Sequence, residues 1–347
     1  MPANLSPEYK AAADAFRKAR EPAERLEHLR EMLRVIPKHK GTDHLQADLK
    51  RRIRELDEEL AGPKRGGARG GPVLVVRPEG AAQVALVGPP NSGKSLLHDR
   101  LTGSGVRSGP YPYTTQFPEP GMLTWEDIHF QLIDLPPIAA GHPVPWLTGA
   151  LQMADACLLV IDLADPDCLE HVASVQAQLR ERKVSLLPRW PAGDDREPPA
   201  PEAATPDDDV FALGLPTLLL ANKADLLEHP ATDVEALAEL EEPHFPTLLV
   251  SAKTGLGLGD LGSLLWRRLA LVRVYTKAPG KPAERDRPFT LRLGEQTVVD
   301  AARLVHRDMV NSLKYARVWG PSVTADGQHV GREHRLADGD VLELHVG

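Results

Sequence analysis

The sequence contains little cysteine and no long apolar run. Its two cysteines, Cys157 and Cys168, cannot form a disulfide framework, and no CxxC pair indicates a zinc site. No stretch approaches the ~20 apolar residues that cross a bilayer. The first ten residues, MPANLSPEYK, lack the apolar segment of a secretory signal. These absences exclude disulfide-stapled and membrane-spanning classes, and we expect a cytoplasmic protein with no membrane partner.

The charge is distributed unevenly along the 347 residues. The net charge is -8, and residues 73–271 hold 13 Lys and Arg against 27 Asp and Glu. Residues 1–72 hold 16 basic against 12 acidic residues, and residues 272–347 hold 12 against 10. A chain of this length predicts two or three domains. Mildly basic ends around an acidic middle allow the ends to contact a polyanion.

The first predicted domain, residues 1–61, is a helical hairpin. Apolar residues recur at helical spacing in EPAERLEHLREMLRVI and again in DHLQADLKRRIRELDEEL, which predicts two amphipathic helices. Between them, Gly41 and Thr42 are typical of a helix stop followed by an N-cap. Residues 62–72, GPKRGGARGGP, are rich in glycine and basic, which predicts a flexible linker.

The second predicted domain spans residues 73–271 and alternates short apolar runs with helical patterns. The runs are VALVG, FQLID, ACLLVID, TLLLANK and TLLVSAK. This order predicts an α/β fold with a parallel-type sheet, whose ligands bind at the carboxyl ends of the strands. Residues 188–215 begin with a proline-rich, acidic stretch, so we expect a disordered insertion there.

The third predicted domain, residues 272–347, is a small mixed sheet packed on one helix. RVYTK, PFTLRL, YARVWG and VLELHV are typical of strands, and TVVDAARLVHRDMVNSL of a helix. Tyr315 and Trp319 have two interpretations, packing under this sheet or stacking on nucleic acid, and we favour packing.

The segment GPPNSGKS, residues 88–95, matches a phosphate-binding loop between a strand and a helix. Gly88 and Gly93 let backbone N–H groups point at phosphate oxygens, Lys94 reaches the β- and γ-phosphates, and Ser95 ligates Mg²⁺. A chance glycine-rich turn is the alternative, which the strand–loop–helix context disfavours. The other predicted nucleotide contacts are Asn91 and Ser92 in this segment and Leu96 directly after it.

Two later strand ends predict which base is bound. NKAD places Asp225 where its carboxylate accepts hydrogen bonds from guanine N1 and N2, a donor edge that adenine lacks. Asn222 braces the phosphate loop, and the stem of Lys223 covers the base. In the SAK segment (Ser251, Ala252 and Lys253), the Ala252 N–H donates to guanine O6. The three motifs together predict a GTP and GDP site.

The metal-side residues lie between these motifs. Thr114 and Thr115, in the proline-bracketed loop YPYTTQFPEPG, offer a hydroxyl to Mg²⁺ in the triphosphate state. Asp134 ends the run FQLID and is placed to hold the metal through water. Lys94, Thr114, Thr115 and Asp134 are therefore the predicted catalytic residues, and Ser95, Thr115 and Asp134 the predicted magnesium ligands.

Together these residues resemble the Obg-related GTPases, and most closely the developmentally regulated GTP-binding protein family. KHKGTDHLQADLKRRIREL resembles the family's N-terminal helical region, and YTK and YARVWG resemble its C-terminal TGS domain. The resemblance implies a P-loop GTPase domain followed by a ubiquitin-like β-grasp domain. It also implies a GTP-hydrolysing switch that contacts ribosome or RNA rather than DNA, with a protein activator. Eukaryotic-type members carry a folded inserted domain, which the insertion here does not resemble.

The turn after Asp134 departs from the usual pattern. A glycine N–H in the aspartate–x–x–glycine turn commonly senses the γ-phosphate, but this position is Pro137, which has no N–H. Ile138 follows, where Ras-like enzymes place the glutamine that orients water. We therefore expect slow hydrolysis. Asn91 resembles the potassium-coordinating residue of cation-stimulated relatives, and a turn asparagine is the alternative.

Three functions fit these residues. The leading one is a slow GTPase switch associated with ribosome or RNA. The second is a binding protein that holds guanine nucleotide as a structural ligand with negligible hydrolysis. The third is an RNA-binding adaptor whose end domains bind the partner.

Overall fold

A computed structural model describes residues 6–19, 22–37, 42–60, 76–103, 117–139, 141, 144–192, 212–292, 294–306 and 308–347. The chain divides into two units, one of residues 1–73 and 203–212, the other of residues 74–202 and 213–347. The predicted linker 62–72 and the residues Thr114 and Thr115 lie outside the described ranges. Within those ranges, no helix has the length and apolar character of a membrane span.

The N-terminal unit contains three helices in its described part, α1 (Pro7–Lys18), α2 (Pro22–Val35) and α3 (Asp43–Leu60). The predicted two-helix hairpin was therefore wrong in omitting α1. Ser6 caps α1 by accepting a hydrogen bond from the Tyr9 N–H at 3.1 Å, and Pro7 suits a first helical position. Tyr9, Leu29 and Leu49 come from the three helices and share one buried core.

The second unit contains a seven-stranded sheet in the order β2-β3-β1-β4-β6-β5, with β7 paired to β6. Its strands are β1 (Ala82–Val87), β2 (Glu119–Trp125), β3 (Ile128–Asp134), β4 (Ala156–Asp162), β5 (Val184–Leu187), β6 (Leu213–Asn222) and β7 (Thr247–Leu249). All five predicted strands are present. The edge strand β2 and the short strand β5 were not predicted. Because β2 pairs antiparallel with β3, whereas β5 pairs parallel with β6, the sheet is mixed rather than wholly parallel.

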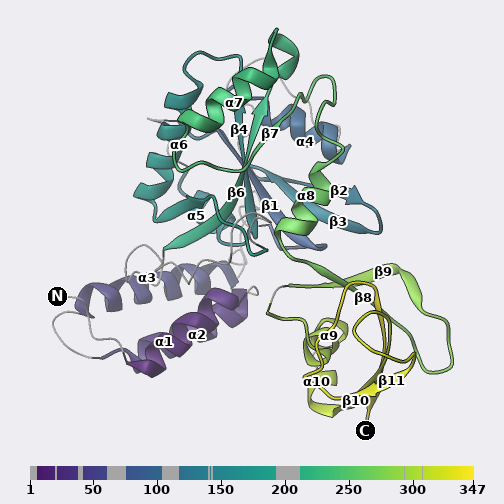
Figure 1. Cartoon of the computed structure of the whole chain (residues 1–347). Helices are drawn as coiled ribbons and strands as arrows, with labels where there is room; N and C mark the ends of the chain where they lie inside the picture. Colours follow the sequence, from purple (N-terminus) through teal and green to yellow (C-terminus); the bar gives the residue numbers. More distant parts are fainter. Residues whose placement is uncertain are drawn as a thin grey trace, which may run out of the picture. The chain divides into compact units, whose positions relative to one another are not determined.

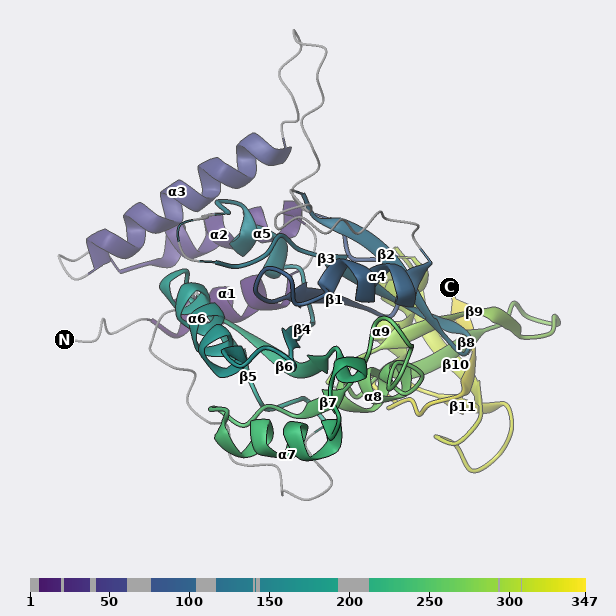
Figure 2. The same cartoon turned by 90° about the horizontal axis from the view of Figure 1, so that it is seen from above.

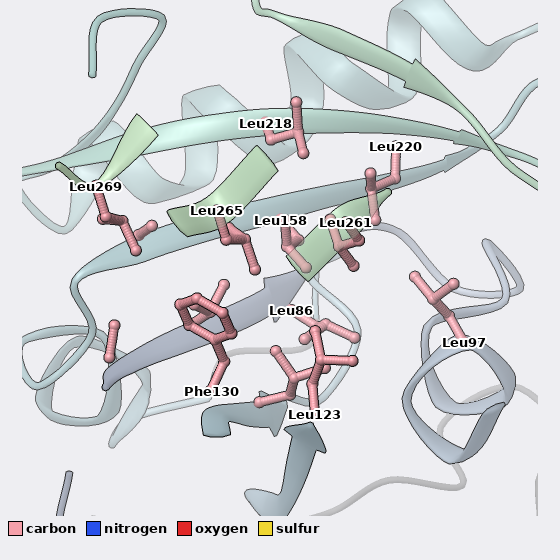
Figure 3. Packing of buried hydrophobic residues seen from close by; sticks show 14 of the residues in the cluster. Leu86, Leu97, Leu123, Phe130, Leu158, Leu218, Leu220, Leu261, Leu265 and Leu269 are labelled. Carbon is pink, nitrogen blue, oxygen red and sulfur yellow. The ribbon is translucent and has the colours of Figure 1, made fainter. Parts of the chain in front are cut away.

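Helices cover both faces of this sheet (Figure 1, Figure 2). They are α4 (Lys94–Thr102), α5 (Leu147–Leu151), α6 (Cys168–Glu181), α7 (Pro230–Leu240) and α8 (Leu261–Arg268), and a 3-10 turn, η2 (Ala224–Leu226), follows β6. Leu97 of α4 and Leu265 of α8 pack with Phe130 and Leu158 on one face (Figure 3). A second buried cluster covers the other face with residues of α5, α6 and α7. This double burial explains why the strands read as continuous apolar runs.

The predicted insertion at 188–215 was too long at both ends. Trp190 is buried and its indole N–H donates to the Thr217 carbonyl at 3.2 Å. At the other end, β6 already begins at Leu213. Residues 193–211 lie outside the described ranges.

The C-terminal region contains a five-stranded sheet in the order β11-β10-β12-β8-β9. The elements are β8 (Val272–Thr276), β9 (Glu284–Leu291), α9 (Val298–Val305), α10 (Met309–Ser312), β10 (Leu313–Trp319), β11 (Gln328–Val330) and β12 (Asp340–Val346). The predicted single helix is split because α9 ends at His306, whose backbone is extended. A capping box of Thr297 and Asp300 starts α9.

Tyr315 and Trp319 do not pack under this sheet, so the favoured interpretation was wrong. Alternation along β10 places Ala316 and Val318 in the core with α9. Tyr315 stacks instead between His329 and His345, with ring centroids at 3.9 and 4.5 Å. Trp319 is covered by the Lys277 ammonium at 4.1 Å.

Candidate guanine-nucleotide site

The phosphate-binding loop joins β1 to α4 at the carboxyl end of the sheet. Gly93 has a φ of 89°, and a side chain there would collide with the Asn222 amide. Gly88 has a φ of 154° and lies against the Val160 carbonyl. Both positions therefore require glycine. Asn91 at the loop apex is exposed with a left-handed φ of 61°, a conformation that asparagine tolerates better than most residues.

Lys94 is buried inside this loop. Its Nζ donates to the carbonyls of Gly88 at 3.1 Å and Pro89 at 2.9 Å. Burial lowers the pKa of Lys94 to about 8, although the nearby Asp134 opposes the shift. A triphosphate would supply the anionic partner that this buried ammonium needs. The observed geometry therefore fits the predicted phosphate role.

Ser95 and Asp134 form the candidate magnesium site. The Ser95 hydroxyl donates to Asp134 Oδ2 at 2.6 Å, so the two predicted ligands lie in contact although they are 39 positions apart in sequence. A hydroxyl and a carboxylate are the hard oxygen donors that Mg²⁺ prefers. Glu119, which pairs with Asp134 across β2 and β3, lies in the same region. Burial raises the pKa of Glu119, and the negative charge of Asp134 adds to the shift.

Asn222 connects the phosphate loop to the base-binding strand ends. Its Nδ2 donates to the Ser92 carbonyl at 2.9 Å, which confirms the predicted bracing. Its Oδ1 accepts from the Ala252 N–H at 2.9 Å. The Ala252 N–H therefore donates to Asn222 in this structure, and its predicted contact with guanine O6 stays a prediction.

The base-recognising carboxylate is held in place by the SAK segment. Asp225 Oδ1 accepts from the Ser251 hydroxyl at 2.6 Å, and Oδ2 lies 3.4 Å from the Lys253 ammonium. The Ser251 hydrogen bond lowers the pKa of Asp225, so the carboxylate remains an acceptor near neutral pH. An ionised carboxylate fits the N1–H and N2–H donors of guanine.

The stem of Lys223 is also fixed, by a partner that the sequence analysis missed. Lys223 has a left-handed φ of 67°, and its Nζ lies 2.6 Å from Asp162 Oδ2 at the end of β4. The signal was available, since Asp162 is another aspartate at the carboxyl end of a buried strand. Leu96, also a predicted contact, lies on α4 with 38% of its surface exposed.

The turn after Asp134 runs beside the phosphate loop. Pro136, Pro137 and Ile138 are all buried. The Ile138 N–H donates to the Gly88 carbonyl at 3.0 Å, and its side chain packs in the second core cluster. The position that carries a water-orienting glutamine in Ras-like enzymes therefore belongs to the core here.

Comparisons with known proteins agree with this geometry. Residues 83–188 match the family described as 50S ribosome-binding GTPase, and residues 272–346 match the TGS domain. A GTP-binding protein of Methanocaldococcus jannaschii, itself uncharacterized, is 29% identical over 93% of this chain and 92% of its own. Developmentally-regulated G-protein 2 of Arabidopsis thaliana is 28% identical over 92% of this chain and 90% of its own.

Among solved structures, a GTP-binding protein of Pyrococcus horikoshii covers 76% of this chain and 100% of its own, with 16% identity and a TM-score of 0.49. By sequence, the chain combines a segment similar to that GTPase family, residues 83–188, with a match to the TGS domain at residues 272–346. Over most of its length it is similar to the developmentally regulated GTP-binding proteins.

Proposed function

We propose that this protein is a GTPase switch with slow intrinsic hydrolysis. One observation carries the proposal: the phosphate loop and the base-binding strand ends are well formed, whereas Ile138 is buried in the core beside them. An aliphatic side chain cannot orient the attacking water by hydrogen bonding, and Pro137 offers no N–H to the γ-phosphate. Nucleotide binding is therefore retained and hydrolysis is weakened.

The residues of the phosphate loop and of the base-binding strand ends account for nucleotide binding. Lys94 pairs with the β- and γ-phosphates, and Asp225 selects guanine. Ser95 and Asp134 would hold Mg²⁺, which supplies charge neutralisation between the β- and γ-phosphates. Thr114 and Thr115 complete the metal side in the triphosphate state. Because Pro137 gives no amide contact, the γ-phosphate is sensed through Lys94, the metal and this threonine pair.

A monovalent cation is the proposed aid to hydrolysis. The exposed, left-handed Asn91 of the phosphate loop supports this, since an amide oxygen is a donor that K⁺ accepts. The expected result is GTP turnover at least several-fold faster in potassium than in sodium at equal ionic strength, with the difference abolished in Asn91→Ala. Equal GTP turnover rates in potassium and sodium would contradict a role for potassium.

The proposed partner is the ribosome or its RNA, which places the protein in the cytoplasm. The family match described as ribosome-binding and the basic excess at both ends of the chain support this. The full-length protein should co-sediment with ribosomes more strongly when loaded with a non-hydrolysable GTP analogue than with GDP. Binding should weaken steeply with salt, because phosphate contacts release counterions. Equal co-sedimentation in both nucleotide states would contradict a ribosome-linked switch.

Pro137 also supports a second function, in which guanine nucleotide is a structural ligand of an RNA-binding adaptor. That protein would hold GTP without hydrolysing it over a day and would bind ribosomes equally with either nucleotide. Single-turnover hydrolysis and the co-sedimentation comparison separate the two functions.

A further inference from the structure

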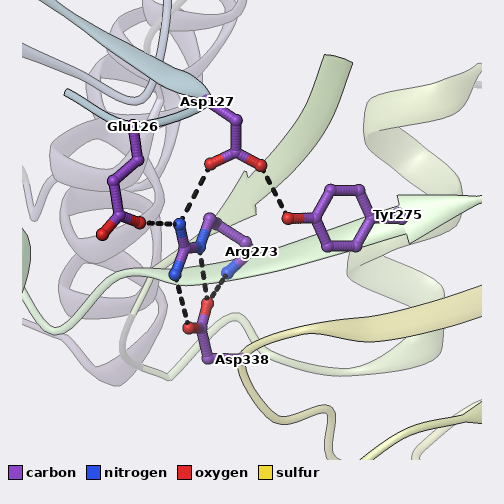
Figure 4. Close-up of polar contacts among 5 residues, drawn as sticks. All are labelled: Glu126, Asp127, Arg273, Tyr275 and Asp338. Atoms are coloured by element: carbon purple, nitrogen blue, oxygen red, sulfur yellow. Dashed lines mark hydrogen bonds and ion pairs between the residues drawn. The ribbon is translucent and has the colours of Figure 1, made fainter. Parts of the chain in front are cut away.

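Arg273 links the TGS domain to the GTPase domain. It lies in β8, the first strand of the TGS domain, and is only 17% exposed at its side chain. Its guanidinium pairs with Asp338 of the TGS domain at 3.0 Å, with Asp127 of the GTPase domain at 3.0 Å, and with Glu126 (Figure 4). The hydrogen bonds to Asp338 and to the other two carboxylates raise the pKa of Arg273 above its ordinary value, so the charge is permanent.

Aromatic packing holds the same guanidinium from the sides. Arg273 lies 5.7 Å from the Trp125 ring centroid and 4.9 Å from that of Trp266. The two rings are 5.6 Å apart, and a side chain at Gly262 of α8 would collide with Trp125. A second contact is the Tyr275 hydroxyl, which donates to Asp127 Oδ2 at 2.6 Å. The pair with Asp127 is part-buried, whereas Glu126 and Asp338 are exposed, so the Asp127 pair is the one expected to contribute more than a surface pair.

Two of the carboxylates that pair with Arg273, those of Glu126 and Asp127, form the tip of the β2–β3 hairpin. Trp125 and Ile128 are the last paired residues on either side of Glu126 and Asp127. Glu126 has a φ of 50°, which is uncommon for a residue other than glycine. The TGS domain therefore fixes a tight turn of the GTPase domain from outside.

The other end of this hairpin lies at the nucleotide site. Glu119, the first residue of β2, pairs with Asp134, the last residue of β3. β3 is held on its far side by parallel pairing with β1, whereas β2 lies at the edge of the sheet. Seven-residue strands span roughly 20 Å, so β2 joins the Glu119–Asp134 end of the hairpin to its tip over that distance.

We propose that Arg273 is a positioning residue that couples the nucleotide state to the TGS domain through the β2–β3 hairpin. A change at the Glu119–Asp134 end of the hairpin moves β2 along β3, and the shifted tip changes its contacts with Arg273 and Tyr275. Because coupling free energies are reciprocal, the TGS contact in turn biases which nucleotide the site prefers. The inference rests on the proposed switch, and it adds the route by which the switch reaches the second domain.

The test compares variants of the full-length protein with Mg²⁺ present. Arg273→Ala removes the ion pairs with Glu126 and Asp127 at the hairpin tip. Tyr275→Phe removes the hydrogen bond to Asp127 while preserving the packing of the ring. Arg292→Ala is the matched control, because Arg292 also joins the TGS domain to the GTPase domain but pairs with Asp155, at 2.6 Å, and not with the residues of the hairpin tip. Fluorescent GDP and a non-hydrolysable GTP analogue give the affinity ratio of each variant. Hydrogen exchange reports on residues 125–128 and on β8 in each nucleotide state.

Two results are expected. The ratio of the two affinities should change by about fivefold or more in Arg273→Ala, by less in Tyr275→Phe, and by less than twofold in Arg292→Ala. Wild-type exchange at the tip and in β8 should differ between the nucleotide states, and Arg273→Ala should lose that difference in β8.

Three results would overturn the coupling. The first is identical exchange at the tip and in β8 in both states of the wild-type chain. The second is an unchanged affinity ratio in a folded Arg273→Ala, or in Tyr275→Phe should the alanine variant fail to fold. The third is an equal change in Arg292→Ala, which would indicate general loosening of the domains. Failure of the switch itself would appear separately, as an absence of wild-type GTP hydrolysis.

Discussion

The two sides of the nucleotide site differ in how completely they are built. On the binding side, Asn222 ties Ser92 to Ala252, and Ser251 holds Asp225, so the phosphate and base elements form one hydrogen-bonded unit. On the hydrolysis side, the turn after Asp134 consists of buried proline and isoleucine. Nucleotide binding needs only groups whose fixed positions complement the nucleotide. Hydrolysis also needs a polar side chain that orients the attacking water. The proposed slow hydrolysis rests on this difference.

Removing the phosphate contact should have the largest effect. Lys94→Ala deletes charged hydrogen bonds to two phosphates, so GTP affinity should fall roughly 10²–10⁴-fold. Equilibrium binding of fluorescent GTP measures the change, and Lys281→Ala, which removes an exposed lysine from the TGS domain, is the control. If a folded Lys94→Ala variant kept its affinity for GTP, the assignment of Lys94 to phosphate binding would be wrong.

Changing the base-recognising carboxylate should have the next largest effect. Asp225→Asn replaces one acceptor with a donor, so GTP affinity should fall about 10–100-fold. Affinity for XTP should rise, because its base carries a carbonyl in place of the guanine amino group. Competition binding gives both values, with Asp233→Asn on α7 as the control. Full GTP selectivity in Asp225→Asn would contradict the assignment of Asp225.

The smallest effect is expected on the hydrolysis side. Ile138→Gln restores the side-chain type of Ras-like enzymes, but the position is 5% exposed and faces the core. The hydrolysis rate should change by less than about threefold, while the free energy of unfolding falls by about 1–3 kcal/mol. Ile138→Val is the apolar control. A tenfold rise in rate would mean that Ile138 occupies the water-orienting position after all.

The motifs on the binding side could be recognised in the sequence because each of them is a short, continuous pattern. Each motif follows an apolar run, and in a parallel sheet the carboxyl ends of the strands meet at one edge. Ser95 and Asp134 could therefore be expected to lie together. The contact between the Ala252 N–H and Asn222 could not be predicted, because the two residues are 30 positions apart. Only the folded turn decides between an intramolecular acceptor and a base.

The features that were missed depend on contacts between distant segments. β2 carries Pro120 and Gly121, so its pattern is a poor strand signal, and pairing with β3 forms it. Arg273 meets Glu126 and Asp127 across more than 140 positions, and no local spacing indicates this. By contrast, α1 had a readable signal, because Ser6 and Pro7 are a typical helix start.

Single-turnover hydrolysis tests the central claim most directly. The wild-type chain is loaded with GTP and Mg²⁺ in sodium buffer without partners, and release of phosphate is followed. A complete binding side combined with a buried Ile138 predicts tight loading and a measurable rate below roughly 10⁻⁴ s⁻¹, slower than unassisted Ras, which has the water-orienting glutamine. A rate faster by a factor of about 100 would contradict the account, and so would no hydrolysis of bound GTP.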